Sequence, residues 1–436
     1  MADELFYNRA LETLDRGSLK LHQDARLRQL LGEIAGNQFY AAKFREAGIS
    51  AQEIKTTDDL CALSFTSKSE LVEEQLAHPP FGRLATYPLS RYPYFHQTSG
   101  TTGRPLKWLD TRESWDCWTR CWGYVYRGAG VAEDDTVFCA FSFGPYMSHW
   151  AAISGAWHIG ATAISGGGMN SEQRLRMILD NQCTVLACTP TYALHLAEAA
   201  RALGIDLRSG PVRVSIHAGE PGASLANVRR SIEGAWGSTC FDHAGATEAG
   251  AWAFACQRAP GAMHLNEAEF IFEVIDSRTG EQMEEGRRGE LVITNLDRAG
   301  MPVLRYRTGD LVEMTSAACG CGRTFARING GVLGRADDML IVRGVNLYPA
   351  AIDDLMHSLP HIAEYEVNIT RVAGMDDLLF RIEAVETGNF AEVAQLAKAA
   401  FRREFNIRVS IEEAAPGSLP RYEFKARRYK RTTLET

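Results

Sequence analysis

Apolar and polar positions recur along the chain with two different periods. Residues 20–85 repeat apolar side chains at helical spacing, so this region is predicted to be helical. From about residue 134 onward, short β-branched or aromatic runs alternate with helical stretches. The predicted strands are 136–143, 184–190, 212–220 and 238–245, and the predicted helices are 171–182, 192–203 and 225–236. This alternation predicts a buried, mainly parallel α/β sheet.

The pattern changes again in the second half of the chain. Residues 268–314 contain alternating strands and predict an antiparallel subdomain, and glycine and charged residues interrupt the pattern near 331–338. The strands 366–372, 378–385 and 408–413 and the helix 390–405 then form a small α+β unit. We therefore expect an α/β protein with two domains. Residues 1–336 are expected to form a large domain with mainly parallel sheets and an antiparallel subdomain, and residues 337–436 a small, mobile α+β domain.

Composition narrows the functional classes. The 436 residues are 45% apolar and 23% charged, which is typical of a globular protein. A net charge of −8 argues against a nucleic-acid partner, which would require a basic face. The chain has no signal-peptide pattern at its start and no run near the roughly 18 apolar residues of a membrane span, so we expect a cytoplasmic protein without a membrane partner. Most of the ten cysteines are then expected to be buried, reduced side chains.

The segment 98–103 contains only glycine, serine and threonine. Glycine allows positive φ and close approach of backbone N–H groups to an anion, and the hydroxyls add further donors. The segment therefore predicts a phosphate-binding loop, although a solvent-exposed polar turn is the alternative. It lacks the Lys–Ser/Thr pair that closes a Walker A loop, so a cation must come from elsewhere.

Charged residues at the ends of predicted strands offer further chemistry. Thr247 and Glu248 follow the strand that ends near 245, where α/β sheets place their ligands, and a carboxylate beside a phosphate can hold Mg²⁺. Asp310 follows a short turn and could accept two hydroxyls such as those of a ribose. Taken alone, Glu248 is more often a helix-start acid, and Asp310 is more often an ordinary turn aspartate. In isolation, Arg335 belongs to an interdomain linker and Lys425 to a solvated loop.

One group of residues has the composition of a metal site. Cys319 and Cys321 cannot form a tetrahedral site alone, but Cys256 and His264 flank a Pro-Gly turn upstream. A Cys₃His zinc site would join the two loops. Its distance from Lys425, for which the resemblance described below implies a catalytic role, favours a structural role for the metal. The alternative is four unrelated buried residues.

The order of the short motifs is more specific than any one of them. The segments TSGTTGRP, AGEP, GATE, YRTGD, GRADDMLIVRGVN and PGSLPRYEFKARR occur in this order along nearly the whole chain. In this respect the sequence resembles the adenylate-forming acyl-CoA synthetases (AMP-binding enzymes). The segments FTSKSELVEEQ and CTPTYALHLAE and the short length make it most similar to their phenylacetate–CoA ligase branch. Several relatives in that branch have similar Cys/His positions, and some resemble zinc proteins.

The resemblance implies ATP-dependent activation of a carboxylic acid to an acyl-adenylate and then transfer to coenzyme A, with Mg²⁺ as cofactor. It places the β- and γ-phosphates on Thr98, Ser99, Gly100, Thr101, Thr102 and Gly103. It places the α-phosphate and Mg²⁺ on Thr247 and Glu248, the adenine beside Gly219, Glu220 and Pro221, and the ribose on Asp310 and Arg335. Lys425 would be the mobile catalytic lysine, and Asp337 the hinge of the small domain.

The sequence departs from the family at the adenine. Relatives usually carry a stacking tyrosine where this chain has Ala244, so the stack is either lost or replaced. By the same resemblance the acyl pocket is expected at Phe143, Tyr146, His217, Ala218 and His243. Aromatic walls are compatible with an aryl acid, and two histidines favour ring hydroxyl or amino substituents, as in hydroxy- or aminobenzoates. Alternatively, one or both histidines have structural partners.

Two other functions share these motifs. An adenylating enzyme that loads an aryl acid onto a carrier protein's phosphopantetheine thiol would differ only in its acceptor. A silent nucleotide-binding scaffold would be expected to lack Lys425, Glu248 or Asp310, and all three are present. Since relatives are often dimers, a homodimer is also an expectation.

Overall fold

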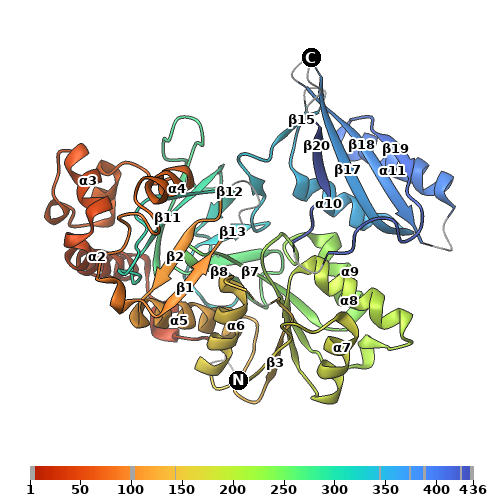
Figure 1. Ribbon diagram of the computed structural model, residues 1–436, viewed down its shortest axis with the longest axis horizontal. Coiled ribbons are helices and arrows are strands. Elements are labelled where there is room, and N and C mark those ends of the chain that lie inside the picture. Colours follow the sequence, from red (N-terminus) through yellow and green to blue (C-terminus); the bar gives the residue numbers. More distant parts are fainter. Residues whose placement is uncertain are drawn as a thin grey trace.

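The computed structural model describes residues 5–98, 104–142, 144–342, 345–372, 375–385, 389–422 and 425–432. Figure 1 shows a large body built around one sheet and a smaller unit, blue in the picture, at the C-terminal end of the chain. No helix in the described ranges is long and apolar enough to span a bilayer.

A mixed sheet, twelve-stranded within the described ranges, forms the centre of the large domain. Its order is β10-β11-β12-β13-β9-β8-β7-β6-β5-β3-β4, and β14 pairs with β12. The parallel part contains β3 (Thr136–Cys139), β4 (Thr162–Ser165), β5 (Val185–Cys188), β6 (Val214–His217) and β7 (Thr239–Ala246). Every residue of β5 and β6 is buried, as expected for strands covered on both faces.

The sheet changes direction at β7, which is parallel to β6 but antiparallel to β8. The antiparallel part contains β8 (Gly250–Ala255), β9 (Ala262–Leu265), β10 (Phe270–Ile275), β11 (Arg288–Asn295), β12 (Tyr306–Thr315), β13 (Arg327–Asn329) and β14 (Gly334–Arg335). The predicted combination of mainly parallel sheet and antiparallel subdomain is therefore confirmed, as one continuous sheet.

Two groups of helices accompany the sheet, one in its parallel part and one in the N-terminal region. The helices of the parallel part are α5 (Arg112–Gly128), α6 (Met147–His158), α7 (Ser171–Asp180), α8 (Pro190–Ala202) and α9 (Ala226–Trp236). The N-terminal helices, red in Figure 1, are α1 (Arg9–Glu12), α2 (Arg16–Glu33), α3 (Gln38–Glu46) and α4 (Lys68–Ala77). Asn37 divides the predicted helical region, because its side chain caps α3 through the Tyr40 N–H. A separate hairpin pairs β1 (Tyr94–Gln97) with β2 (Lys107–Asp110).

The C-terminal unit, called the lid below, has its own sheet and core. Its elements are β15 (Leu340–Val342), β16 (Val345–Leu347), α10 (Pro349–Ser358), β17 (Ile362–Val372), β18 (Met375–Ala384), α11 (Phe390–Phe405), β19 (Ser410–Glu413) and β20 (Tyr429–Thr432). The main lid sheet has the order β19-β18-β17-β20, and buried apolar side chains of the lid form a cluster separate from those of the large domain. Figure 1 shows α10 of the lid beside α9 of the large domain.

Candidate active site

The predicted phosphate loop connects β1 and β2, which hold its two ends together. The Thr98 N–H donates to the Leu106 carbonyl (3.0 Å), and the Leu106 N–H donates to Thr98 Oγ1 (2.9 Å). Thr98 therefore closes the base of the loop. Ser99, Gly100, Thr101, Thr102 and Gly103 lie outside the described residues.

Thr247 and Glu248 lie in the turn between β7 and β8, beside the point where the sheet changes direction. The carboxylate of Glu248 is buried and accepts a hydrogen bond from the Tyr306 hydroxyl (2.6 Å). The Lys68 ammonium, at the start of α4, lies 4.0 Å from the same oxygen. Burial and the neighbouring carboxylate raise the pKa of Tyr306, which therefore remains a donor.

A buried arginine, Arg298, holds the backbone of the turn that contains Thr247 and Glu248. The Arg298 guanidinium donates to the carbonyls of Thr247 (3.1 Å) and Glu248 (3.0 Å) and to Asp110 Oδ1 (2.7 Å). Arg298 and Asp110 are almost fully buried, and the second Asp110 oxygen lies 3.8 Å from His96 Nδ1. Since His96 and Asp110 belong to β1 and β2, this network joins the phosphate-loop hairpin to the Glu248 turn.

Asp310 and Arg335 are brought together by the pairing of β12 with β14. They are partners in the strand register, and the Arg335 guanidinium donates to Asp310 Oδ1 (3.2 Å). Burial raises the pKa of Asp310 to about 6, although the positive charges of Arg335 and Lys425 oppose this shift. Asp337, the predicted hinge, is exposed between β14 and β15 and accepts a hydrogen bond from Arg335 (3.1 Å).

Lys425 reaches this site from the lid, and the sites predicted on two domains thus meet. Its side chain retains solvent access, but protein surrounds it: the desolvation lowers its pKa, while the negative charges of Glu220 and Asp310 act in the opposite direction. Arg335 and Lys68 lower the pKa further through their positive charges. Cationic and carboxylate side chains from both domains therefore lie near the Lys425 ammonium.

The loop after β6 contains Gly219, Glu220 and Pro221. Asp242 on β7 organises this loop by accepting the N–H groups of Gly222 (3.2 Å), Ala223 (2.7 Å) and Ser224 (2.7 Å). Desolvation raises the pKa of the buried Asp242 carboxyl, and the backbone donors oppose the shift. The loop is consequently a fixed surface facing the lid.

The predicted acyl-pocket residues occupy adjacent elements. His217 and Ala218 lie at the carboxyl end of β6, His243 on β7 and Tyr146 at the start of α6, whereas Phe143 lies outside the described residues. Both ring nitrogens of His217 have protein partners: Nδ1 contacts the Cys188 carbonyl (3.2 Å) and Nε2 contacts Ser215 Oγ (3.0 Å). Burial lowers its pKa to about 4. His217 therefore has the structural environment that the alternative interpretation describes.

His243 is different. Its ring packs edge-on against Trp122, with 4.6 Å between centroids, and its Nδ1 has no hydrogen-bond partner within the described part of the chain. Burial lowers the pKa of His243 to about 4, so the imidazole is neutral at physiological pH. Ala244, where relatives have tyrosine, is partly buried against the same core.

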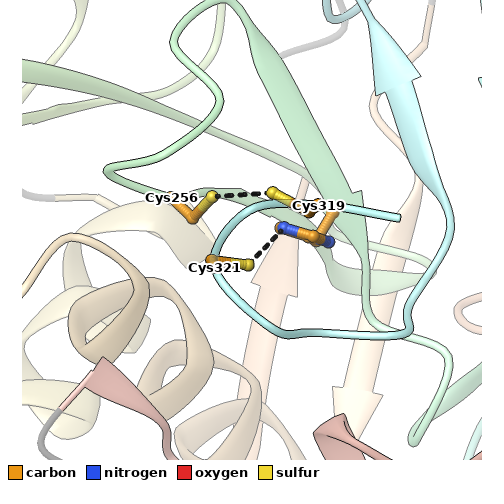
Figure 2. Close-up of side chains that lie close together, drawn as sticks. Cys256, Cys319 and Cys321 are labelled. Atoms are coloured by element: carbon orange, nitrogen blue, oxygen red, sulfur yellow. Dashed lines mark hydrogen bonds between the residues drawn. The ribbon is translucent and has the colours of Figure 1, made fainter. Parts of the chain in front are cut away.

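The four residues of the predicted metal site converge (Figure 2). The ligand atoms of Cys256, His264, Cys319 and Cys321 all lie within 4.8 Å of one another. Cys256 Sγ lies 3.8 Å from Cys319 Sγ, and Cys321 Sγ lies 3.4 Å from His264 Nε2. The other His264 nitrogen contacts the Phe325 carbonyl (3.2 Å), which orients the ring toward the sulfurs. Of the other seven cysteines, all but Cys61 are buried, as predicted.

Several residues of the site were not predicted from the sequence. Tyr306 and Asp242 stand inside or beside the motifs YRTGD and GATE, so their positions carried a signal that was not used. Lys68 stands in FTSKSELVEEQ, which served only to identify the branch. Arg298 and Asp110 had no signal, because a charged residue in a turn or at a strand end is ordinarily exposed.

Comparisons with known proteins agree with this geometry. Residues 89–296 match the family described as AMP-binding enzyme, and residues 344–430 match the AMP-binding enzyme C-terminal domain. The phenylacetate-coenzyme A ligase of Thermus thermophilus is 31% identical over 90% of this chain and 87% of its own length. That of Pseudomonas putida is 31% identical over 95% and 94%, respectively. The chain belongs to the phenylacetate–CoA ligase-like branch of the AMP-binding enzymes. The predicted class, an ATP-dependent acid–CoA ligase that forms an acyl-adenylate, is thereby confirmed.

Solved structures of one relative in two conformational states differ in their similarity to this chain. A 2-hydroxyisobutyryl-CoA ligase in its postadenylation state with 2-HIB-AMP matches with a TM-score of 0.94 at 30% identity, covering 99% of this chain and 93% of that one. The same ligase in its thioesterification state, with CoA, matches with a TM-score of 0.75, covering 99% and 94%. Since the two comparisons hardly differ in coverage, the overall arrangement of this chain is more similar to the postadenylation structure of that ligase than to its thioesterification structure.

Proposed function

We propose that this ligase activates a hydroxy- or amino-substituted benzoate and transfers it to coenzyme A, giving aryl-CoA, AMP and pyrophosphate. The observation that carries the choice of acid is His243, a buried neutral imidazole that packs on Trp122 and has an unpartnered Nδ1. A buried nitrogen without a partner favours a ligand that supplies one. A ring hydroxyl or amino group does so, and the aromatic neighbours fit a flat ring.

The other residues have roles in two half-reactions. In the first, a carboxylate oxygen of the acid attacks the α-phosphorus of ATP, and the bond to pyrophosphate breaks. Lys425 would bridge the two anionic reactants, the loop 98–103 would hold the leaving phosphates, and Asp310 with Arg335 would orient the ribose. Thr247 and Glu248 would face the α-phosphate. Glu248 offers a carboxylate oxygen, the ligand type that Mg²⁺ prefers, and the ion would neutralise phosphate charge. In the second half-reaction, the thiol sulfur attacks the acyl carbon and AMP leaves.

The test is an acid-dependent pyrophosphate-release assay at fixed ATP. Hydroxy- and aminobenzoates are expected to give the highest kcat/KM, above benzoate, phenylacetate and 2-hydroxyisobutyrate. His243→Leu should reduce the preference for substituted over unsubstituted benzoate by about 10-fold or more, because only the substituted acid uses the histidine. His217→Gln is the matched control and should leave this preference unchanged. A preference of the natural chain for phenylacetate or an aliphatic acid would contradict the proposal.

The thiol acceptor is tested in the same assay. Thioester formation is expected with free coenzyme A, as the relatives' activity supports. Transfer to a carrier protein's phosphopantetheine thiol but not to coenzyme A would favour the alternative acceptor instead.

We also propose that Cys256, His264, Cys319 and Cys321 bind a structural zinc ion. At a tetrahedral centre with Zn–S bonds of about 2.3 Å, two sulfurs lie about 3.8 Å apart. The 3.8 Å between Cys256 and Cys319 fits this spacing. Three thiols and one oriented imidazole form a complete donor set with no position left for a substrate, which supports a structural role.

A further inference from the structure

Glu220 holds two parts of the protein with one carboxylate. Its Oε1 accepts a hydrogen bond from the Thr191 N–H (2.9 Å), in the first turn of α8. Its Oε2 accepts one from the Ala426 N–H (3.0 Å), the residue that follows Lys425 in the lid. The resemblance to the family places this residue beside the adenine. The structure instead engages both oxygens of its side chain with backbone amides.

The residue before Glu220 is in contact with the lysine itself. Gly219 has φ of 95°, and a Cβ added there would lie 3.1 Å from Lys425 Cε and 3.8 Å from its Cγ. The Lys425 side chain therefore runs across Gly219 while the Ala426 amide is held by Glu220. Together, Gly219 and Glu220 form a surface that fixes both the backbone and the stem of Lys425.

The two contacts of Glu220 differ in what they require of the lid. The contact with Thr191 joins two segments of the large domain, so it persists wherever the lid lies. The contact with Ala426 exists only when the lid is docked as in this structure. The Lys425 loop, between β19 and β20, makes a second contact, because Arg421 pairs with Glu198 (3.1 Å) on α8. A further lid contact lies outside this loop: Asp354, in α10, accepts the Asn227 N–H (2.9 Å) of α9.

We propose that Glu220 is a positioning residue that docks the Lys425 loop for adenylate formation and releases it for thioester formation. This inference rests on the proposed two-step function. Its physical basis is alignment, because the Lys425 ammonium has to contact the carboxylate of the acid and the α-phosphate at the same time. A displacement of a catalytic group by about 1 Å can reduce a rate about 10²-fold. Charge also contributes, because the carboxylate favours the protonated form of Lys425.

The experiment measures the half-reactions separately in Glu220→Gln and Glu220→Ala. The glutamine amide retains a single acceptor oxygen, so it can satisfy either Thr191 or Ala426 but not both. Glu220→Gln should slow acid-dependent pyrophosphate release about 10-fold and Glu220→Ala about 10²-fold. Thiolysis of a supplied acyl-adenylate by coenzyme A should change less than about 2-fold in both variants. Asp354→Asn, which removes a carboxylate that joins the lid to α9 outside the lysine loop, is the matched control and should change pyrophosphate release only slightly.

A second measurement does not depend on activity. Hydrogen exchange of the ligand-free protein should show faster exchange at the Ala426 amide in Glu220→Ala than in the natural chain, with Asp354→Asn unchanged. Equal slowing of both half-reactions, or unaltered exchange at Ala426, would overturn the positioning role. If the natural chain formed no adenylate from any acid, the proposed function would fail, whereas the exchange result would still decide whether Glu220 holds the loop.

Discussion

Arg298 shows how much the site depends on a residue that contacts no reactant. Its guanidinium connects the carbonyls of Thr247 and Glu248 to the Asp110 carboxylate, and the indole rings of Trp108 and Trp118 flank it. A buried charge is tolerated because the opposite charge and the carbonyls satisfy it. The same contacts fix the backbone that presents Glu248. The Arg298 side chain therefore contributes both to the stability of the fold and to the geometry of the site.

At this residue we expect Arg298→Met to lower the free energy of unfolding by about 3–5 kcal/mol, because it leaves the buried Asp110 unpaired. Adding Asp110→Asn should restore part of that loss, since the buried charge is then removed. Denaturant unfolding measures both changes. Pyrophosphate release should stay impaired in the double variant, because the carbonyls of Thr247 and Glu248 still lack their donor. Recovery of activity together with stability would contradict a positioning effect.

Asp310 gives the second prediction at the residue scale. Its pKa of about 6 lies above the ordinary value, so the carboxylate takes up a proton as the pH falls through 6. If it accepts ribose hydroxyls, the KM for ATP should rise several-fold between pH 7.5 and 5.5. Asp310→Asn should raise this KM at pH 7.5 and make it nearly independent of pH. The variant also controls for the protonation of ATP, and an equally steep pH dependence in both proteins would exclude Asp310 as the cause.

Residues of the site differ in how far the sequence could predict them. Lys425, Glu248 and Asp310 stand in ordered motifs, so resemblance located them, and the structure brings them toward one space. Arg298 could not be found, because its role depends on burial between segments 188 positions apart. The sequence leaves two interpretations of His217, a ligand contact and a structural histidine. The Cys188 carbonyl and Ser215 contact both of its nitrogens, and such partners are visible only in three dimensions.

At the scale of elements, the loop that carries Cys319 and Cys321 fastens the N-terminal segment to the sheet. Arg323 forms a buried ion pair with Glu12, and the Thr324 N–H donates to the Glu12 carbonyl (2.9 Å). Cys256 and His264 hold the other side of this loop, from the end of β8 and from β9. A metal bound here would therefore stabilise the packing of the N-terminal segment without contacting the reactants.

For this element we expect about one zinc ion per chain in the purified protein, measured by elemental analysis. Cys319→Ser should lose the metal and lower the Tm by several degrees, since ligand binding stabilises only the folded state. Cys183→Ser, a buried cysteine outside the cluster, is the control and should retain the metal. Protein without zinc whose Tm is unaffected by Cys319→Ser would reject the site.

The elements themselves were predicted better than their arrangement. Strands such as 184–190 and helices such as 192–203 have clear periodicity, because each buries a defined set of positions. The short strands β13 and β14 have too few residues for a pattern, yet β13 pairs with both β9 and β12 and closes the antiparallel part. The spatial order of the strands depends on such long-range pairing, so periodicity could not reveal it.

At the scale of the whole molecule, the predicted phosphate loop and Lys425, the cation proposed for it, belong to different domains. Within the described residues, polar contacts between the lid and the segment from α8 to α9 include Arg421 with Glu198, Asp354 with Asn227, and Ala426 with Glu220. The Asp354 carboxylate also accepts a backbone N–H in the first turn of α9, from Asn227. It thus takes the place of an N-cap side chain, because Leu225 at the N-cap has no side-chain acceptor. These contacts are polar, and α10 of the lid also packs beside α9.

The final prediction tests the division of labour that this geometry implies. Lys425→Ala should slow adenylate formation about 10²–10³-fold, because it removes the cation that aligns and neutralises the two anions. Thiolysis of a supplied acyl-adenylate should be nearly unchanged, since the proposed turning of the lid for the second half-reaction would carry the lysine out of the site. Lys398→Ala removes an exposed lysine from α11 of the same lid and should affect neither step. Single-turnover measurements of both half-reactions distinguish the outcomes, and equal loss in the two would show that Lys425 remains in the site throughout.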